Sequence, residues 1–216
     1  MIENFSHYAF FIADGLRLTL ILTVCSLLFS LIGGIAFAIL RYQYWLRFAI
    51  DGFVSVLRGT PMILQLNFFY FAVPGLLGLP IDILTAGICT LGLNSSAYVA
   101  EILRGGIESL PKGQFEAAKT LRIPTWLIWK DIILPQVFRN ELPTLVNEYI
   151  TILKDTSLIS TLGGMDLMRR SQTLAAEKFD YFGPLCVAGL YYYVLILVVT
   201  YLGKWAEKRW CHDNNR

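Results

Sequence analysis

Charged residues are scarce in this chain. Asp, Glu, Lys and Arg make up 16% of its 216 residues, whereas 56% are hydrophobic. Soluble domains carry about 25% charged residues and about 45–50% apolar ones. The excess of apolar side chains needs a non-aqueous solvent, which predicts an integral membrane protein. The net charge of +2, without a long basic run, argues against a nucleic-acid partner.

Groups that perform covalent chemistry are also few. Both histidines lie outside the predicted spans, and the sequence contains neither HExxH nor GxSxG, so we assign no catalytic residue. The four cysteines have no CxxC spacing, and we assign no metal ligand. No phosphate-binding motif of the form GxxxxGK followed by Ser or Thr occurs. We therefore expect no cofactor in this chain, with any ATP and Mg²⁺ bound by another subunit.

Long apolar runs predict membrane-spanning helices, because about 20 such residues cross a hydrocarbon core of about 30 Å. The N-terminus lacks the positive start and cleavage site of a signal peptide, so the first run counts as a span. We expect a single transmembrane domain over residues 1–216, with five spans at about 15–40, 59–75, 81–102, 134–153 and 181–204. The fourth contains Arg139, Glu141 and Glu148, which favours a position inside the bundle rather than against lipid.

Lysine and arginine are unevenly distributed between the predicted loops. Most of them follow the first span, follow the third span, or lie in the C-terminal tail. Because positive loops stay in the cytoplasm, this pattern predicts an N-terminus outside and a C-terminus inside. An odd number of spans agrees with that orientation. The loop at 104–133 is then cytoplasmic.

The loop at 104–133 contains two short helical stretches separated by Arg122-Ile123-Pro124. Residues 114–121 are mostly good helix formers, and Trp126 could face the membrane interface. A pair of short helices below a bundle is suited to docking a cytoplasmic partner. From composition alone, an amphipathic connector remains the alternative.

The spacing of one motif in this loop is specific. The pattern is EAA, three residues, Gly, nine residues and I-x-L-P, matched here by Glu116, Ala117, Ala118, Ile132, Leu134 and Pro135. The chain thereby resembles the permease subunits of binding-protein-dependent ABC importers. Three further segments are similar to the branch that carries polar amino acids: Arg58–Leu66, Ala97–Gln114 and Leu153–Ser160.

This resemblance implies an all-α, type I importer fold in a bacterial inner membrane. It also implies four kinds of neighbour: a dimer of ATPase subunits, a second permease that is identical or homologous, an extracytoplasmic amino-acid-binding protein, and membrane lipid. The EAA segment would be the coupling helix that lies in a groove on the ATPase, with small alanines allowing close approach. The residues expected to couple are Gly113, Gln114, Glu116, Ala117, Ala118 and Arg122.

Arg122 departs from the family pattern, which has glycine at this position. A glycine there allows a left-handed residue between the two short helices, and an L-residue would pay roughly 1–2 kcal/mol for that conformation. We hypothesise that Pro124 makes the break in this chain, while Arg122 adds a cation near the ATPase.

Polar residues within the spans are candidates for the substrate pathway. A carboxylate at Glu148 is costly unless it is paired, and the ammonium of an amino acid could be its partner. A structural pair with another helix is the alternative. Asn147, Gln65 and Asn94 are further pathway candidates, although hydrogen bonds between helices would also explain them.

Two short motifs are candidates for gating or structural roles. At the start of the second span, Pro61 fits a first helical turn, Thr60 could cap it, and Arg58 suits the headgroups. At the outer end of the fourth span, Lys154 and Asp155 could serve an outer gate or meet the binding protein.

Three questions stay open at this point. The same loop would serve an importer of another small solute, and a passive channel or carrier would need no docking loop. The sequence also leaves the carried amino acid undetermined, among glutamine, arginine, histidine, glutamate and cystine. A homodimer and a pair with a related subunit are both compatible with it.

Overall fold

The computed structural model describes residues 2–41 and 44–211, and every regular element in them is a helix. In chain order these are α1 (Ile2–Ala13), α2 (Leu16–Leu40), α3 (Tyr44–Gly59), α4 (Met62–Asn67), the π-helical η1 (Phe68–Ala72), α5 (Val73–Leu77), α6 (Ile83–Ser109), α7 (Lys112–Thr120), α8 (Thr125–Leu127), the π-helical η2 (Ile128–Ile133), α9 (Leu134–Asp155), the 3₁₀-helical η3 (Thr156–Leu162), α10 (Leu167–Lys178) and α11 (Phe182–Cys211).

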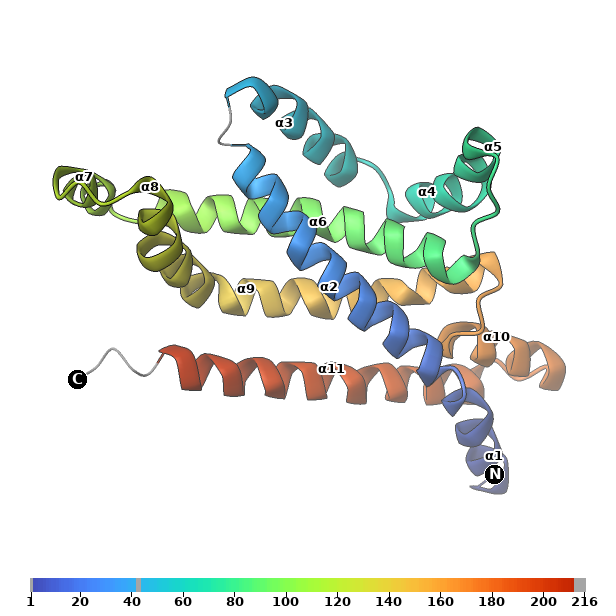
Figure 1. Cartoon of the computed structure of the whole chain (residues 1–216). Helices are drawn as coiled ribbons and strands as arrows, with labels where there is room; N and C mark the ends of the chain where they lie inside the picture. Colours follow the sequence, from blue (N-terminus) through green and yellow to red (C-terminus); the bar gives the residue numbers. More distant parts are fainter. Residues whose placement is uncertain (1, 42–43, 212–216) are drawn as a thin grey trace.

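Four long helices, α2, α6, α9 and α11, form the bundle (Figure 1). α2 crosses α6 over much of its length, and α9 packs against both α6 and α11. The α2–α6 contact depends on small residues: a Cβ added to Gly92 would lie 2.7 Å from the ring of Phe29. Small residues are the usual means by which membrane helices approach closely, since lipid supplies no hydrophobic drive for association.

By length and composition, three helices of the described residues can cross a membrane: Tyr8–Leu40, Ile83–Ser109 and Phe182–Arg209. A fourth crossing would be formed by Trp45–Gly59 and Met62–Leu77, two helices that meet at a bend of 105°. α9, which contains Arg139, Glu141 and Glu148, is not among them. The count of five crossings therefore stays a prediction, although helices occupy all five predicted ranges.

The second predicted span differs most from the structure. It was expected to begin near residue 59, but α3 already covers Tyr44–Gly59 and ends where the span was to start. Arg47, Asp51 and Arg58 interrupt the apolar run, which made this helix look like a loop. The bend that follows has a local cause, because Pro61 has no N–H to donate and keeps Thr60 out of the helical region.

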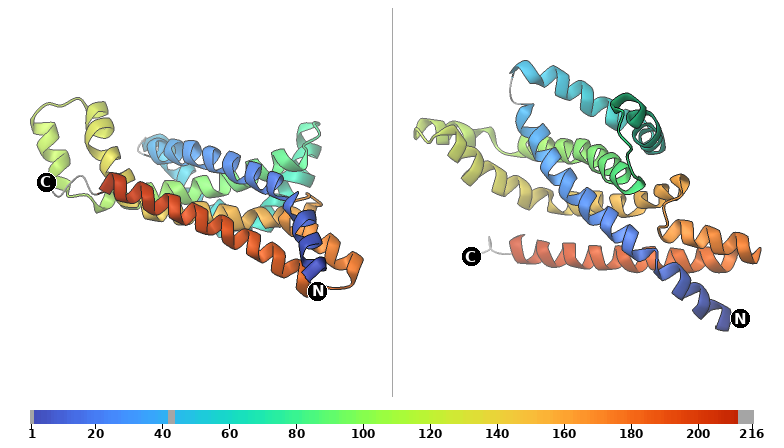
Figure 2. Two further views of the ribbon diagram at one scale, coloured as in Figure 1. Left: turned by 90° about the horizontal axis from the view of Figure 1, so that it is seen from below. Right: turned by 45° about the vertical axis from the view of Figure 1, so that its right-hand side comes forward.

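The two ends of the bundle are built differently. At one end α7 and α8 project beyond the long helices, and at the other α1 and α10 pack against α11 (Figure 2). Buried Ile12, Leu167, Leu174 and Val187 form the apolar core of this second end. α10 lies between the fourth and fifth predicted spans, where the sequence analysis predicted no helix.

Candidate coupling surface and substrate pocket

The projecting hairpin of α7, α8 and η2 is fixed by side-chain contacts. Phe115 of α7 meets Trp129 of η2 edge to face, with ring centroids 5.6 Å apart. The amides of Gln114 and Gln136 donate to each other over 3.0 and 3.3 Å. These contacts join the predicted coupling helix to the start of α9.

The exposed face of α7 contains only some of the predicted coupling residues. Gly113, Glu116 and Ala117 are exposed. Ala118 is 4% exposed and packs into the chain's own apolar core, so it cannot provide a close approach to a partner. Gln114 is half-buried and engaged with Gln136.

Leu121, which the sequence did not single out, adds an apolar contact site at the end of α7. Its side chain is 74% exposed and follows directly on the last residue of the helix. The only feature of the sequence that could have indicated Leu121 is its position, as an apolar residue directly before the break between the two short helices.

Arg122 adopts the left-handed conformation that a glycine would supply, with φ of 56°. Its N–H donates to the carbonyl of Lys119 over 2.9 Å, and the N–H of Ile123 donates to Ala118 over 3.1 Å. This is the pattern by which a left-handed residue ends a helix. Pro124 then precedes α8. The break is thus made at Arg122 as well, and not by Pro124 alone.

A polar cavity of about 320 Å³ lies where the start of α4, the middle of α6 and the second half of α9 meet. It is lined by Thr60, Met62, Leu91, Asn94, Ser95, Tyr98, Glu148, Thr151, Ile152 and Asp155. The carboxylate of Glu148 accepts a hydrogen bond from the hydroxyl of Ser95 over 2.7 Å. Within the described residues, no lysine or arginine pairs with Glu148 or Asp155. We call this cavity the substrate pocket, after the role that we propose for it below.

Two predicted pathway residues do not line the substrate pocket. Asn147 is exposed on another face of α9, because consecutive residues of a helix point about 100° apart. Gln65 is buried behind the pocket wall, where its amide nitrogen donates to the carbonyl of Leu57 over 2.7 Å. Asn94 does line the pocket, and its amide also donates to Leu57 and to Gln65, over 2.9 and 3.0 Å.

These amides satisfy backbone groups at the bend between α3 and α4. An unpaired carbonyl would be costly inside a membrane. Gln65 and Asn94 therefore have a structural role, because their amides pair with a backbone carbonyl. The hydroxyl of Thr60 donates to the carbonyl of Val56 over 2.8 Å and accepts from Gln65 over 2.7 Å. Thr60 therefore does not cap α4, and Pro61 stands just before that helix rather than in its first turn.

Arg58 is engaged by two groups within the protein. Its guanidinium pairs with Glu101 at 3.2 Å and lies over the ring of Tyr98, 5.2 Å from the centroid. Lys154 is exposed at the end of α9, whereas Asp155 next to it lines the substrate pocket. The two motifs that were predicted as candidates for gating or structural roles thus meet at one cavity, through Thr60 and Asp155.

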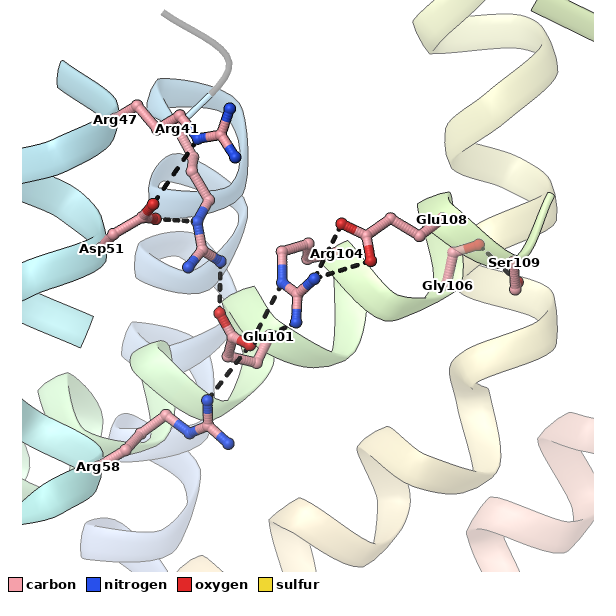
Figure 3. A network of polar contacts seen from close by, with 9 residues as sticks. All are labelled: Arg41, Arg47, Asp51, Arg58, Glu101, Arg104, Gly106, Glu108 and Ser109. Carbon is pink, nitrogen blue, oxygen red and sulfur yellow. Dashed lines mark hydrogen bonds and ion pairs between the residues drawn. The ribbon is translucent and has the colours of Figure 1, made fainter. Parts of the chain in front are cut away.

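Glu101 is the centre of an ion-pair network that sequence reasoning missed (Figure 3). Arg41, Arg58 and Arg104 all pair with it. Arg41 also pairs with Asp51 of α3. These residues lie far apart in the sequence, and only a carboxylate within an apolar run marked Glu101.

A second buried carboxylate, Asp166, joins helices at the other end of the bundle. It is 0% exposed, accepts from the N–H of Arg169 over 2.9 Å, and accepts from the hydroxyl of Tyr192 over 3.1 Å. Burial raises the pKa of Asp166, while these hydrogen bonds oppose the rise. The first bond caps α10, and the second ties α10 to α11. No sequence motif marked this residue.

Comparison with known proteins identifies the chain. Residues 15–211 match the model of the family described as binding-protein-dependent transport system inner membrane component. The chain belongs to this family. It is therefore a membrane-embedded permease subunit and not an enzyme, since ATP hydrolysis in such importers belongs to a partner ATPase.

Related permease proteins align with this chain over almost its full length. The putative glutamine transport system permease protein GlnP of Rickettsia conorii is 43% identical over 202 residues, which is 93% of each chain. The arginine transport system permease protein ArtQ of Bacillus subtilis is 43% identical over 201 residues, 92% of each. GlnP of Escherichia coli K12 is 34% identical over 199 residues, 91% of each.

Solved structures confirm the fold. An amino acid ABC transporter crystallised with histidines matches with a TM-score of 0.88 and 32% identity, covering 97% of this chain and 98% of the other. The methionine transporter MetNI, in an inward-facing form, matches with a TM-score of 0.80 at 18% identity, covering 93% and 96%. The predicted all-α, type I importer permease fold is thus confirmed, and nothing supports a passive channel.

Proposed function

We propose that this permease carries a polar amino acid through the substrate pocket, and that the amino acid has a cationic side chain. It would act with a second permease, an ATPase dimer and an extracytoplasmic binding protein. The relatives named for glutamine and arginine transport support an amino-acid cargo. The pocket itself supports the finer choice of a cation.

The observation that carries this proposal is the pair of carboxylates in the substrate pocket. Glu148 and Asp155 face one cavity without a lysine or arginine paired to either, among the described residues. Removing a carboxylate from water is costly unless a cation accompanies it. A basic amino acid brings an ammonium and a side-chain cation, one for each carboxylate. Glutamine offers only the first, and glutamate adds a repelling charge.

The size of the pocket suits a single small molecule. Its 320 Å³ lies at the lower end of the range of about 300–1,000 Å³ seen for ligand cavities. Hydroxyl and amide groups from Thr60, Asn94 and Thr151 line it beside the carboxylates and can bind a polar cargo.

For coupling, we propose that Glu116, Ala117 and Leu121 form the surface that docks on the ATPase, which binds ATP and Mg²⁺. These side chains are exposed together on the projecting hairpin. The contacts of Phe115 and Gln114 with the start of α9 would carry the movement into the bundle. ATP can drive this movement only if the docking surface binds the two states of the ATPase with different affinities.

The test is uptake by proteoliposomes that hold the complete importer. Glu148→Gln and Asp155→Asn should each raise the KM for a labelled basic amino acid about tenfold or more, because loss of one partner of a desolvated charge pair costs roughly 2–5 kcal/mol. Asn147→Ala, one residue from Glu148 but facing away from the pocket, is the matched control. Arginine should compete with the label better than glutamine in the wild type.

Uptake at the wild-type KM in both acidic-residue variants would refute the pocket assignment. Stronger competition by glutamine than by arginine would refute the cationic cargo and leave the pocket in place. Equal accumulation in vesicles without ATP would contradict active import.

A further inference from the structure

Glu101 collects guanidinium groups from three segments of the chain. Its Oε1 receives Arg41 from the end of α2, and its Oε2 receives Arg58 of α3 at 3.2 Å and Arg104 of α6 at 2.9 Å (Figure 3). The side chain of Glu101 is 16% exposed and that of Arg41 is 17% exposed. Partial burial and shared hydrogen bonds make such a network stronger than isolated surface pairs.

The charges in this network are close to balance only while Glu101 is ionised. Asp51 lies between Arg41 and Arg47, and Glu108 accepts two hydrogen bonds from Arg104. Four guanidiniums thus face three carboxylates. Neutralising Glu101 would leave two net positive charges among crowded arginines and remove the one group that all three helices share.

The network lies between the substrate pocket and the projecting hairpin of α7, α8 and η2, which we call the coupling hairpin after its proposed role. Along α6, Asn94 and Ser95 line the pocket, Tyr98 follows after one turn, Glu101 after the next, and Ser109 ends the helix just before α7. Arg58 connects the two regions, since it pairs with Glu101 and covers the ring of Tyr98, which itself lines the pocket.

α3 depends on few attachments near this point. It packs on α6 through a small apolar cluster that includes Val54, Leu57 and Ala97. Beyond that cluster, the amides of Gln65 and Asn94 both donate to the carbonyl of Leu57 in its last turn, and the ion pairs with Arg41 and Glu101 hold its charged face. The position of Arg58 over Tyr98 is therefore set largely by Glu101.

We infer that Glu101 is a positioning residue for Arg58, and that Arg58 over Tyr98 closes the side of the substrate pocket that faces the coupling hairpin. Opening of the Glu101–Arg58 pair accompanies release of the amino acid towards that side. This inference rests on the proposed role of the pocket. It predicts that a weakened pair lets cargo pass back through the permease, so that ATP is hydrolysed with less net accumulation.

The experiment measures amino acid accumulated per ATP hydrolysed by the complete importer in proteoliposomes, and the leak of preloaded label without ATP. Glu101→Gln and Arg58→Gln should each lower the ratio threefold or more and speed the leak, with ATPase activity retained. The double variant should be no worse than Glu101→Gln alone, because the Glu101–Arg58 pair is already lost in that variant. Arg58→Lys keeps a cation for Glu101 and should restore part of the ratio.

Glu108→Gln is the matched control, since it removes another carboxylate partner of Arg104 without touching Arg58. A wild-type ratio and leak in both Glu101→Gln and Arg58→Gln would overturn the inference, as would additive losses in the double variant. If Glu101→Gln fails to assemble, Arg58→Gln and Tyr98→Leu decide by the same two measurements. An increased KM in Glu148→Gln with an unchanged ratio in these variants would refute the gate alone and leave the pocket intact.

Discussion

At the scale of single residues, Arg122 combines a strained backbone conformation with a positive charge. It holds a left-handed backbone with φ of 56° in an exposed position, where the family pattern has glycine. That conformation costs an L-residue roughly 1–2 kcal/mol. The positive charge of Arg122 is a proposed reason for keeping this strained residue. Substitutions can separate the effect of the backbone strain from the effect of the charge.

We predict that Arg122→Gly raises the free energy of unfolding of the purified permease by up to about 1 kcal/mol. Relief of the strain should exceed the roughly 0.4–1 kcal/mol that glycine's freedom in the unfolded chain costs. Thermal unfolding measures this. Arg122→Asn, which tolerates the left-handed region but carries no charge, is the control for coupling. Unchanged ATPase stimulation in both variants would remove any role for the cation.

Asp166 gives a pH-dependent prediction, because burial raises its pKa in the folded protein. Its charged form is then the costly one, so its contribution to stability should be largest below the unfolded pKa of about 3.9 and be lost as pH rises through the folded value. Asp166→Asn removes this titration. The melting temperature of the wild type relative to that variant should therefore increase as pH falls from 7 towards 4. A difference independent of pH would contradict the raised pKa.

The sequence predicted the pocket only in part. Glu148 was found because a carboxylate deep within a predicted span is costly unless it is paired, and Asn94 because it is a polar residue within a predicted span. Asn147 does not line the pocket, and the sequence could not show this, since the rotation of α9 about its axis depends on α6 and cannot be read from one helix. Asp155 was assigned to a gate for its place at a helix end, without any sign that it shares a cavity with Glu148.

At the scale of elements, two adjacent glycines in α6 have different surroundings. A Cβ on Gly106 would lie 2.6 Å from Cγ of Glu141 and 2.9 Å from Val137, both on α9. A Cβ on Gly105 would meet nothing within 4 Å. Close packing of α6 on α9 near the coupling hairpin therefore requires glycine at position 106 but not at position 105.

Gly106→Ala should destabilise the protein by roughly 1–3 kcal/mol, because the added methyl forces α9 away from α6. Gly105→Ala should be neutral or stabilise by up to about 1 kcal/mol, through its better helix propensity. Denaturation of the two purified variants in parallel measures the difference. Equal effects at both positions would show that the α6–α9 contact does not depend on a glycine.

The elements most readily predicted were those with long uncharged runs. α2, α6 and α11 lie close to their predicted ranges, since apolar length alone marks a span. α3 was missed because Arg47, Asp51 and Arg58 break its hydropathy, although these charges are paired within the fold. Charge pairing across helices is a tertiary property, and no window of the sequence contains it.

At the scale of the whole molecule, we propose that the two ends of the bundle lie on opposite sides of the membrane. The hairpin of α7 and α8 lies at one end and α10 at the other (Figure 2). The positive loops predict that the hairpin is cytoplasmic and α10 extracytoplasmic. The same arrangement is needed for Ala117 to reach an ATPase and for α10 to face a binding protein.

Cysteine labelling tests orientation and docking together. In a chain whose four cysteines are replaced by serine, Ala117→Cys should react with a membrane-impermeant maleimide only from the cytoplasmic side, and Lys178→Cys only from the opposite side. Both side chains are exposed, so access depends on the membrane and on partners. Adding the ATPase should slow labelling at Ala117→Cys about tenfold and leave Lys178→Cys unchanged. Labelling of Ala117→Cys from outside would invert the topology, whereas cytoplasmic labelling unaffected by the ATPase would remove α7 as the docking surface while keeping the topology.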